Sequence, residues 1–205
     1  MTEGGVDVAS ENQTARSRAK ADRRRQLLQA AARLIAERGF VGVRLEDLGS
    51  AVGISGPAVY RYFPNKEALL VELLVDISRR LLDGGTAVAE AAQSPEDALA
   101  GLVEFHLDFA LGEPDLIRVQ DRDLESLPPA ERRQVRQFQR RYVEVWVQVL
   151  QKVDPVLEEA DARIKAHATF GLINSTPHSA SRTSATRTRT ILRQMTVAAL
   201  APGAA

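Results

Sequence analysis

Basic side chains are concentrated in the first third of this chain, where they could bind an anionic partner. Residues 13–66 hold eleven Lys and Arg against four Asp and Glu, a balance of +7, whereas residues 67–205 carry −4. A basic segment followed by an acidic remainder is what a polyanion-binding module joined to a different domain would show. The same run of charge could also be only a solvated face. Charge alone therefore makes nucleic acid a candidate partner without establishing it.

Within the basic region, the segment "GISGPAVYRYFPNKEALL", which begins at Gly53, places three aromatic residues within four positions. Val59 and Phe63 stand four residues apart, so on a helix we expect both to face the core. Tyr60 and Tyr62 then project from other sides of the same helix. Their hydroxyls are either free to bind a partner, or the two rings only help to pack a small domain.

Other kinds of chemistry find no support in the residues. There is no cysteine, so disulfides and thiolate metal sites are excluded. The chain contains no dinucleotide-binding glycine motif, P-loop, nucleophile elbow or zinc-protease motif. The three histidines, His106, His167 and His178, lack the spacing of metal ligands. We therefore expect no enzyme activity, no cofactor and no bound metal.

Nothing in the sequence predicts a membrane protein. Residues 1–25 are polar and lack the apolar run of a signal peptide, and the longest apolar stretches, such as 68–75, are too short to cross a bilayer. The absence of cysteine suits a reducing compartment. We expect a soluble, cytoplasmic protein that does not associate with membranes.

Apolar residues recur at helical spacing along most of the chain, and no run alternates convincingly at period two, so the predicted fold class is all-α. Residues 1–20 lack an apolar period and are expected to form a disordered arm that becomes basic towards its end. Asp22 could cap the first helix, and Gly39 could end it. The remaining helices are expected over 45–52, 57–62, 65–82, 95–111, 115–124, 129–153, 157–175 and 185–200, with Gly84-Gly85 breaking the fourth.

Two short helices meeting at "AVGIS" are typical of a helix-turn-helix motif. Such a pair needs small residues where the helices pack, for which Ala51 and Gly53 are the candidates, and an apolar residue, Ile54, to seal the turn. Ser55 is a suitable N-cap for the second helix, and Pro57 lies in its first turn, where a missing N–H costs nothing. The second helix must present its N-terminal half to the major groove of DNA.

The segment "VRLEDLGSAVGISGPAVYRYFPNKEALL" and the helix before it resemble the DNA-binding domain of the TetR family of bacterial transcriptional regulators. The joint pattern is Gly-Ile-Ser, three residues, Val-Tyr-Arg-Tyr-Phe, two residues, then Lys-Glu-Ala-Leu. The close match covers about Arg23–Leu74, and the rest of the chain matches in architecture. The resemblance implies a three-helix DNA-binding domain at 21–66 and a larger helical ligand-binding and dimerisation domain at 67–205.

The resemblance also implies which residues meet DNA. Arg44, Tyr60, Tyr62 and Lys66 match phosphate-contacting positions, and the base-facing tip carries no polar side chain beyond Ser55. Arg61 is then the best candidate for a bidentate guanine contact, with Arg44 second. The predicted DNA-binding residues are Arg44, Ser55, Gly56, Pro57, Ala58, Tyr60, Arg61, Tyr62 and Lys66, joined by an arm of Arg16, Arg18 and Lys20 in the minor groove.

In this family the last two helices usually pair with a second subunit, so a homodimer is expected. Gly171 and Ser175, four residues apart, form a small-residue face that permits close helix approach. Asn174 and His178 could hydrogen-bond at that interface or reach a ligand, and we favour the interface. The predicted dimer residues are Gly171, Leu172, Asn174, Ser175, His178, Ile191, Leu192 and Met195.

A ligand cavity is expected between the fourth helix and the helices at 95–111, 113–124 and 129–153. Its walls would be mostly apolar, which suggests a small hydrophobic effector, for example an acyl or multi-ring compound or an acyl-CoA thioester. Aromatic residues at helical spacing can equally be ordinary core. The predicted ligand-binding residues are Leu73, Ile77, Phe105, His106, Phe109, Arg122, Phe138, Tyr142 and Trp146.

The predicted function is a ligand-responsive repressor that binds a palindromic DNA operator and leaves it when a hydrophobic effector binds. A different class also fits the composition: a helical lipid carrier or scaffold whose basic tip binds RNA or a membrane. A regulator would protect a palindromic site on DNA and bind it less tightly as salt rises, whereas a carrier would show no sequence preference.

Overall fold

The computed structural model describes residues 5–176 and 184–201, with side chains from residue 16 onward. This part of the chain contains helices and no strand, which confirms the all-α prediction. Contacts between Cα atoms divide the chain after Leu73 into two compact units, residues 1–73 and 74–205. The division comes seven residues later than the domain boundary expected after residue 66.

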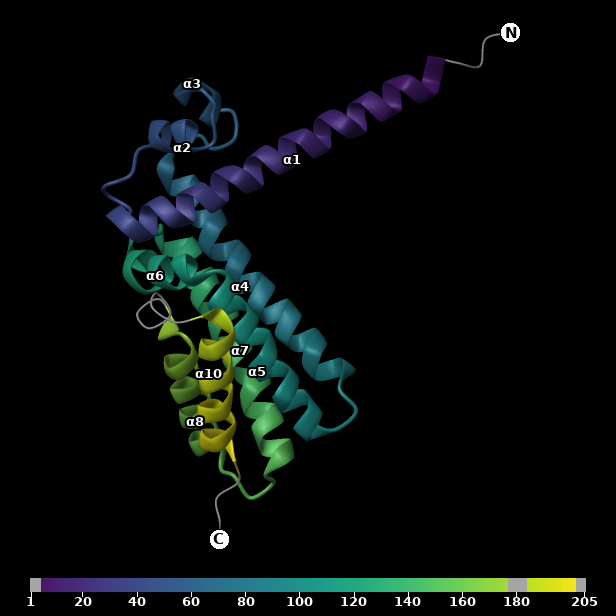
Figure 1. Cartoon of the computed structure of the whole chain (residues 1–205), viewed down its shortest axis with the longest axis vertical. Helices are drawn as coiled ribbons and strands as arrows, with labels where there is room; N and C mark the ends of the chain where they lie inside the picture. The colour runs from purple at the N-terminus through teal and green to yellow at the C-terminus, as the bar shows by residue number, and fades with distance from the viewer. Residues whose placement is uncertain (1–4, 177–183, 202–205) are drawn as a thin grey trace. The chain divides into compact units, whose positions relative to one another are not determined.

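The first unit is built from α1 (Gly5–Arg38), α2 (Leu45–Ala51), α3 (Gly56–Val59) and the beginning of α4 (Lys66–Ala91) (Figure 1). The core face of α1 carries apolar residues at helical spacing, among them Leu27, Ala31 and Ile35, each with no exposed surface. Gly39 ends α1 with a positive φ of 79°, and its N–H donates to the Ile35 carbonyl over 2.8 Å. The predicted C-terminal glycine is thereby confirmed.

The beginning of α1 differs from the sequence-based expectation. Residues 5–20, predicted to be a disordered arm, are helical, and Asp22 lies inside the helix rather than at its cap. Asp22 instead pairs with Arg25 on the next turn. All side chains from Arg16 to Asp22 are exposed. Residues 16–22 have no apolar period because their side chains face solvent; they extend the packed part of the same helix, and the Ala and Arg residues among them favour helix.

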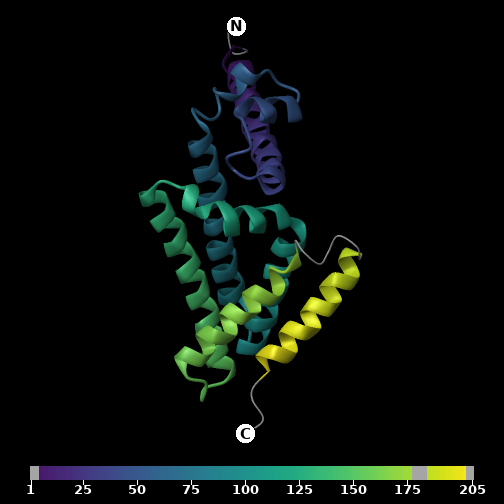
Figure 2. The same ribbon diagram turned by 90° about the vertical axis from the view of Figure 1, so that its left-hand side faces the viewer.

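The second unit contains the rest of α4 together with α5 (Pro95–Gly112), α6 (Pro114–Asp123), a single 3-10 turn at Leu124–Ser126, α7 (Pro129–Val153), α8 (Glu159–Ile173) and α10 (Ala185–Leu200). Within this unit, α6 lies across the long helices, as both views show (Figure 1, Figure 2). Helix α10 packs against α5 and α8, and α7 packs against α5 and α8. In the described residues no helix is both long and apolar enough to cross a membrane.

Two adjacent glycines in α4 have a different role from the predicted one. Gly84-Gly85 was expected to break the helix, but α4 continues to Ala91. A Cβ atom added to Gly84 would lie 2.4 Å from the Phe105 ring, and one added to Gly85 would lie 2.4 Å from the Tyr142 ring. The glycines therefore allow rings from α5 and α7 to pack directly on the α4 backbone, and that packing outweighs their weak helix propensity.

Candidate functional site

The helix pair α2–α3 is held close by a glycine that the sequence analysis did not single out. Gly49 is buried, and a Cβ at this position would lie 2.9 Å from the Ile54 carbonyl oxygen and 3.0 Å from Val59 Cγ2. The predicted packing residues are elsewhere: Ala51 is exposed, and Gly53 has no atom within 4 Å of its Cβ position. Gly53 forms the turn instead, with a φ of 72° that favours glycine.

The aromatic segment divides by face as its spacing predicted. Val59 and Phe63 have no exposed surface, which confirms that both belong to the core. Tyr60 is 48% exposed, and Tyr62 is half-buried. Helix α3 itself is shorter than expected and ends at Val59, followed by turn residues. Tyr60 is therefore the more exposed of the two tyrosines that are predicted to contact phosphate.

Several basic residues of the first unit bind the protein itself. Arg24 donates through Nε to Glu72 over 2.6 Å and through Nη1 to the Tyr62 carbonyl over 2.6 Å, and its guanidinium lies 4.4 Å from the centroid of the Phe63 ring. Arg23 donates to the Val52 carbonyl over 2.9 Å. These two arginines connect α1 to the segments around it. Their guanidinium groups are engaged in hydrogen bonds within the protein and are less available to bind DNA.

Lys66 also makes internal contacts. Its ammonium group donates to the carbonyls of Phe40 and Val41 over 2.8 and 3.3 Å and lies 4.5 Å from the centroid of the Phe40 ring. At the start of the same helix, Asn65 accepts a hydrogen bond from the Ala68 N–H over 2.7 Å. A phosphate contact by Lys66 would have to share or replace its bonds to the two carbonyls.

Seven cations remain available on the surface of the first unit. Each of them is exposed and makes no ion pair with any side chain that the structure describes. They come from α1, from the residue before α2 and from the turn after α3: Arg16, Arg18, Lys20, Arg33, Arg38, Arg44 and Arg61. The strongest sequence-based candidates for base contact, Arg61 and Arg44, are both in this set.

An acidic residue lies beside the predicted base-facing tip, and sequence analysis did not assign it a role. Glu46 accepts a hydrogen bond from the Tyr60 hydroxyl over 2.9 Å, which raises the pKa of Tyr60. A Cβ added to Gly56 would lie 2.9 Å from Glu46 Cγ. The absence of a side chain at Gly56 therefore lets the Glu46 stem pack over the start of α3.

The second unit contains a cavity of about 240 Å³ walled by α4, α5, α6, α7 and α8. Three of the predicted ligand-binding residues line it: His106, Phe109 and Tyr142. Asn174, for which the dimer interface was favoured over a ligand contact, also lines the cavity. The full lining is Ser78, Leu81, His106, Phe109, Ile117, Gln120, Gln139, Tyr142, Val143, His167, Phe170 and Asn174.

The other predicted ligand residues lie outside this cavity lining. Trp146 is fully buried behind it and packs edge-on against Tyr142 and Phe170, with ring centroids 6.4 and 5.2 Å away. Phe105 packs on Gly84, and Arg122 forms an ion pair with Asp123 over 3.1 Å. Leu73 and Ile77 are buried core residues, and Phe138 is half-buried; none of these three lines the cavity.

A chain of hydrogen bonds crosses the cavity wall from α7 to α5 to the end of α8. The oxygen of the Asn174 carboxamide lies 3.1 Å from His106 Nε2, and the Tyr142 hydroxyl lies 3.3 Å from His106 Nδ1. Burial lowers the pKa of His106 to about 4, while the bond to Asn174 acts weakly in the opposite direction. Burial also raises the pKa of Tyr142. Both groups are therefore uncharged near neutral pH.

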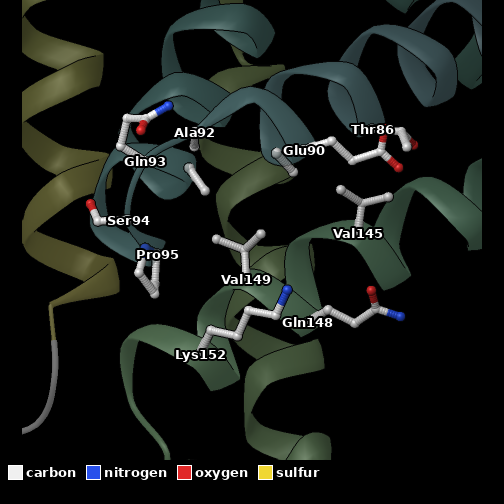
Figure 3. Close-up of a pocket in the computed structure, with 12 residues that line it drawn as sticks. Thr86, Glu90, Ala92, Gln93, Ser94, Pro95, Val145, Gln148, Val149 and Lys152 are labelled. Atoms are coloured by element: carbon white, nitrogen blue, oxygen red, sulfur yellow. The ribbon is translucent and has the colours of Figure 1, made fainter.

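A second hollow of about 480 Å³ lies between α4, the start of α5 and α7 (Figure 3). Its walls include four exposed polar side chains, Glu90, Gln93, Gln148 and Lys152. The smaller cavity also opens to solvent, beside the exposed His167, but its walls include the buried side chains of His106, Phe109 and Tyr142. The smaller cavity is the better candidate for a site that recognises an apolar molecule.

The predicted dimer residues do not all face outward. Gly171, Ile191 and Met195 are exposed, Leu172 and Ser175 are half-buried, and Leu192 packs into the protomer. His178 lies outside the described residues. Ile164 on α8, 66% exposed, belongs with the outward set although sequence analysis did not name it.

Comparison with known proteins places both units in the same family. Residues 27–73 match the model of bacterial regulatory proteins of the tetR family, and residues 92–178 match the model of the tetracyclin repressor-like C-terminal domain. The chain is 31% identical over 129 residues to the HTH-type transcriptional regulator EthR of Mycolicibacterium smegmatis. That match covers 60% of this chain and 59% of EthR, less than two thirds of the relative's length.

Solved structures show the same fold. A TetR-family transcriptional regulator from Bordetella parapertussis aligns with a TM-score of 0.75 and 22% identity, over 85% of this chain and 93% of that one. The structure of AibR in complex with isovaleryl coenzyme A and operator DNA aligns with a TM-score of 0.68 and 17% identity, over 84% and 97% of the two chains. With both family models matched in chain order and the helix-turn-helix in place, this chain belongs to the TetR family of bacterial regulatory proteins.

Proposed function

We propose that this protein is a transcriptional repressor that binds a palindromic operator as a homodimer and is released by a small apolar effector. The observation that carries the proposal is the pairing, in one chain, of a helix-turn-helix surrounded by unpaired cations with a separate helical unit that encloses a partly apolar cavity. Helix α4 contributes to both: Glu72 binds Arg24 in the first unit, and Ser78 and Leu81 line the cavity in the second.

The proposal of a dimer is based on an exposed apolar face formed by α8 and α10. Ile164 on α8 and Ile191 and Met195 on α10 are 66%, 44% and 49% exposed, although they are large apolar side chains. Gly171 on α8 has no atom within 4 Å of its Cβ position, which leaves room for a neighbouring helix. Burial of this face against a second copy would remove apolar surface from water, and two recognition helices would then read two half-sites.

The proposed class of effector is based on the residues that line the cavity. Among the described lining residues, Leu81, Phe109, Ile117, Val143 and Phe170 are apolar, and none is Lys, Arg, Asp or Glu. An acyl chain or a ring system would bury its surface against such walls. The phosphates of a coenzyme A thioester, as found in the AibR complex, would find no Lys or Arg among these residues. The proposal is therefore an uncharged apolar effector.

Release would follow from a shift between two arrangements of the dimer. A ligand that binds one arrangement more tightly moves the population towards it, by no more than its difference in affinity for the two. Since α4 belongs to both units, we propose it as the element through which cavity occupancy reaches the DNA-binding helices. A probe that fills the cavity should then lower operator affinity.

The test of DNA reading is selection of a site from a random duplex pool, followed by fluorescence anisotropy with the selected duplex. We expect two half-sites about one helical turn apart and affinity that falls steeply with salt. Arg61→Ala should weaken binding about 10- to 100-fold by removing a base contact. Arg33→Ala removes an equal charge from an exposed site on α1 and is the control. If both variants lose the same amount of affinity, Arg61 makes no base contact. If no site is selected from the pool, the protein does not recognise a specific DNA sequence.

Replacing Glu46 gives an independent test of the same surface. Its carboxylate lies beside the base-facing tip, where DNA phosphates would repel it, so Glu46→Gln should tighten operator binding about fivefold, the effect of roughly 1 kcal/mol of repulsion. Glu37→Gln, on an exposed part of α1, should change affinity little. If Glu46→Gln instead weakens binding at one operator position, Glu46 accepts a hydrogen bond from a cytosine amino group there.

A further inference from the structure

The cavity of the second unit offers a directed set of hydrogen-bonding groups, and their direction restricts the chemistry of the effector. The oxygen of the Asn174 carboxamide faces His106 Nε2 at 3.1 Å, so this ring nitrogen carries the imidazole proton and donates it. His106 Nδ1 is then the acceptor for the Tyr142 hydroxyl at 3.3 Å. The bonds run in one sense, from Tyr142 through His106 to Asn174.

This arrangement uses the acceptor side of Asn174 and leaves its donor side free. The carboxamide nitrogen of Asn174 has no hydrogen-bond acceptor among the described residues, and the side chain lines the cavity. His106 has both ring nitrogens occupied, and Ser78 donates to the Leu74 carbonyl over 2.7 Å. A ligand that enters this part of the cavity therefore meets an N–H donor next to apolar walls.

We infer that the effector is a small uncharged molecule with a carbonyl oxygen, such as a ketone, ester, lactone or amide, which accepts a hydrogen bond from the Asn174 carboxamide. The inference rests on the proposed function, because it names the chemistry of the proposed effector. Three features of the cavity select this class over its competitors.

First, the described lining contains no Lys, Arg, Asp or Glu; of its two histidines, the buried His106 is uncharged and His167 is exposed to solvent, so a charged group deep in the cavity would lose its hydration without an ion-pair partner. Second, a ligand that only donates hydrogen bonds would leave the Asn174 amide N–H without a partner. Third, the volume of about 240 Å³ lies below the roughly 300–1,000 Å³ of sites for drug-sized ligands, which favours a compact molecule.

Four probes that share a phenyl ring and a short alkyl chain separate these classes. They are valerophenone (ketone), its alcohol phenylpentanol, the hydrocarbon pentylbenzene and the anion phenylvalerate, each titrated calorimetrically into the full chain without DNA. We expect valerophenone to bind about tenfold more tightly than pentylbenzene, the effect of one satisfied hydrogen bond, and phenylvalerate to bind most weakly. A tighter complex with phenylpentanol or phenylvalerate than with valerophenone overturns the inference.

Variants at two carboxamides assign the preference to a residue. Asn174→Leu should abolish the advantage of valerophenone over pentylbenzene while pentylbenzene binds as before. Asn174→Asp retains an acceptor for His106 Nε2, which protects the fold, but lacks the donor and should also lose the advantage. Gln139→Leu is the control: it removes another half-buried carboxamide of the same cavity, and the variant should still bind valerophenone more tightly than pentylbenzene.

The outcomes distinguish failure of this inference from failure of the proposed function. If no probe binds, or if the ketone advantage survives in both Asn174 variants, Asn174 does not recognise a carbonyl group, whereas operator selection and the Arg61→Ala result are unaffected. If valerophenone binds as expected but leaves operator affinity unchanged, the cavity chemistry is right and the proposed release by this site is wrong.

Discussion

Gly49→Val should cause the largest loss of specific DNA binding among single substitutions in α2 and α3, more than about 100-fold, because the displaced helix would lose several phosphate contacts together. A Cβ at Gly49 would lie 2.9 Å from the Ile54 carbonyl oxygen, and backbone atoms cannot swing aside as a flexible side chain can. The helices must separate, at a cost of about 1–3 kcal/mol for overpacking. Anisotropy with the selected operator measures the affinity.

Ala51→Val is the matched control, since it adds the same side chain to the same helix at an exposed position. Affinity and fold should be nearly unchanged. Comparing Gly49→Val with Ala51→Val also tests which residue lies where α2 packs on α3: Gly49, as in the structure, or Ala51 and Gly53, as predicted from the sequence. If Ala51→Val is the more harmful change, the packing of α2 on α3 differs from the structure. Valerophenone titration of Gly49→Val shows whether the second unit is still intact.

Arg24→Ala should destabilise the first unit more than any other replacement of a basic side chain there. The guanidinium bonds to Glu72 and to the Tyr62 carbonyl and lies over the Phe63 ring, so one side chain joins α1, the segment after α3 and α4. The pair is about one third exposed, which reduces its contribution, and we expect a loss of about 2–3 kcal/mol in the free energy of unfolding. Hydrogen exchange of amides in α1, α2 and α3 measures it.

Arg25→Ala provides the comparison at the next position of the same helix. It removes the same charge, but Arg25 is exposed and pairs with Asp22 one turn away, so the loss should be below about 0.5 kcal/mol. If exchange rates rise equally in the two variants, net charge rather than the Arg24 contacts sets the stability of this unit. Operator affinity should fall in Arg24→Ala through partial unfolding and should be restored at lower temperature.

The helices of the second unit were predictable because their apolar residues recur locally at helical spacing. The predicted ranges 95–111 and 129–153 agree closely with α5 and α7, and the residues before and after them carry the expected proline and polar signals. The predicted break at Gly84-Gly85 was wrong because the continuation of α4 depends on contacts that are distant in sequence. Local propensity predicts a break, and only the rings of Phe105 and Tyr142, far along the chain, show why α4 continues.

The cavity shows more clearly what helical periodicity cannot predict, namely which residues of a buried face line a ligand site. The repeat of aromatic residues on α7 predicted that Phe138, Tyr142 and Trp146 share a face, but it could not show that Tyr142 lines the cavity while Trp146 is fully buried behind it. Sequence analysis also missed Phe170 and Gln139. No local pattern marks these residues, since what makes them lining residues is the approach of α8 and α7 to the same space.

By itself the sequence determined the all-α class, the helix-turn-helix and the family, because each depends on residue types at fixed short spacing. The tertiary structure decided which basic residues are free: Arg61 remains exposed, whereas Arg24 is bound by Glu72, 48 positions away. It likewise places the Asn174 carboxamide 3.1 Å from His106, 68 positions away. Side-chain partners so distant in sequence are set by the packing of whole helices, which local spacing does not encode.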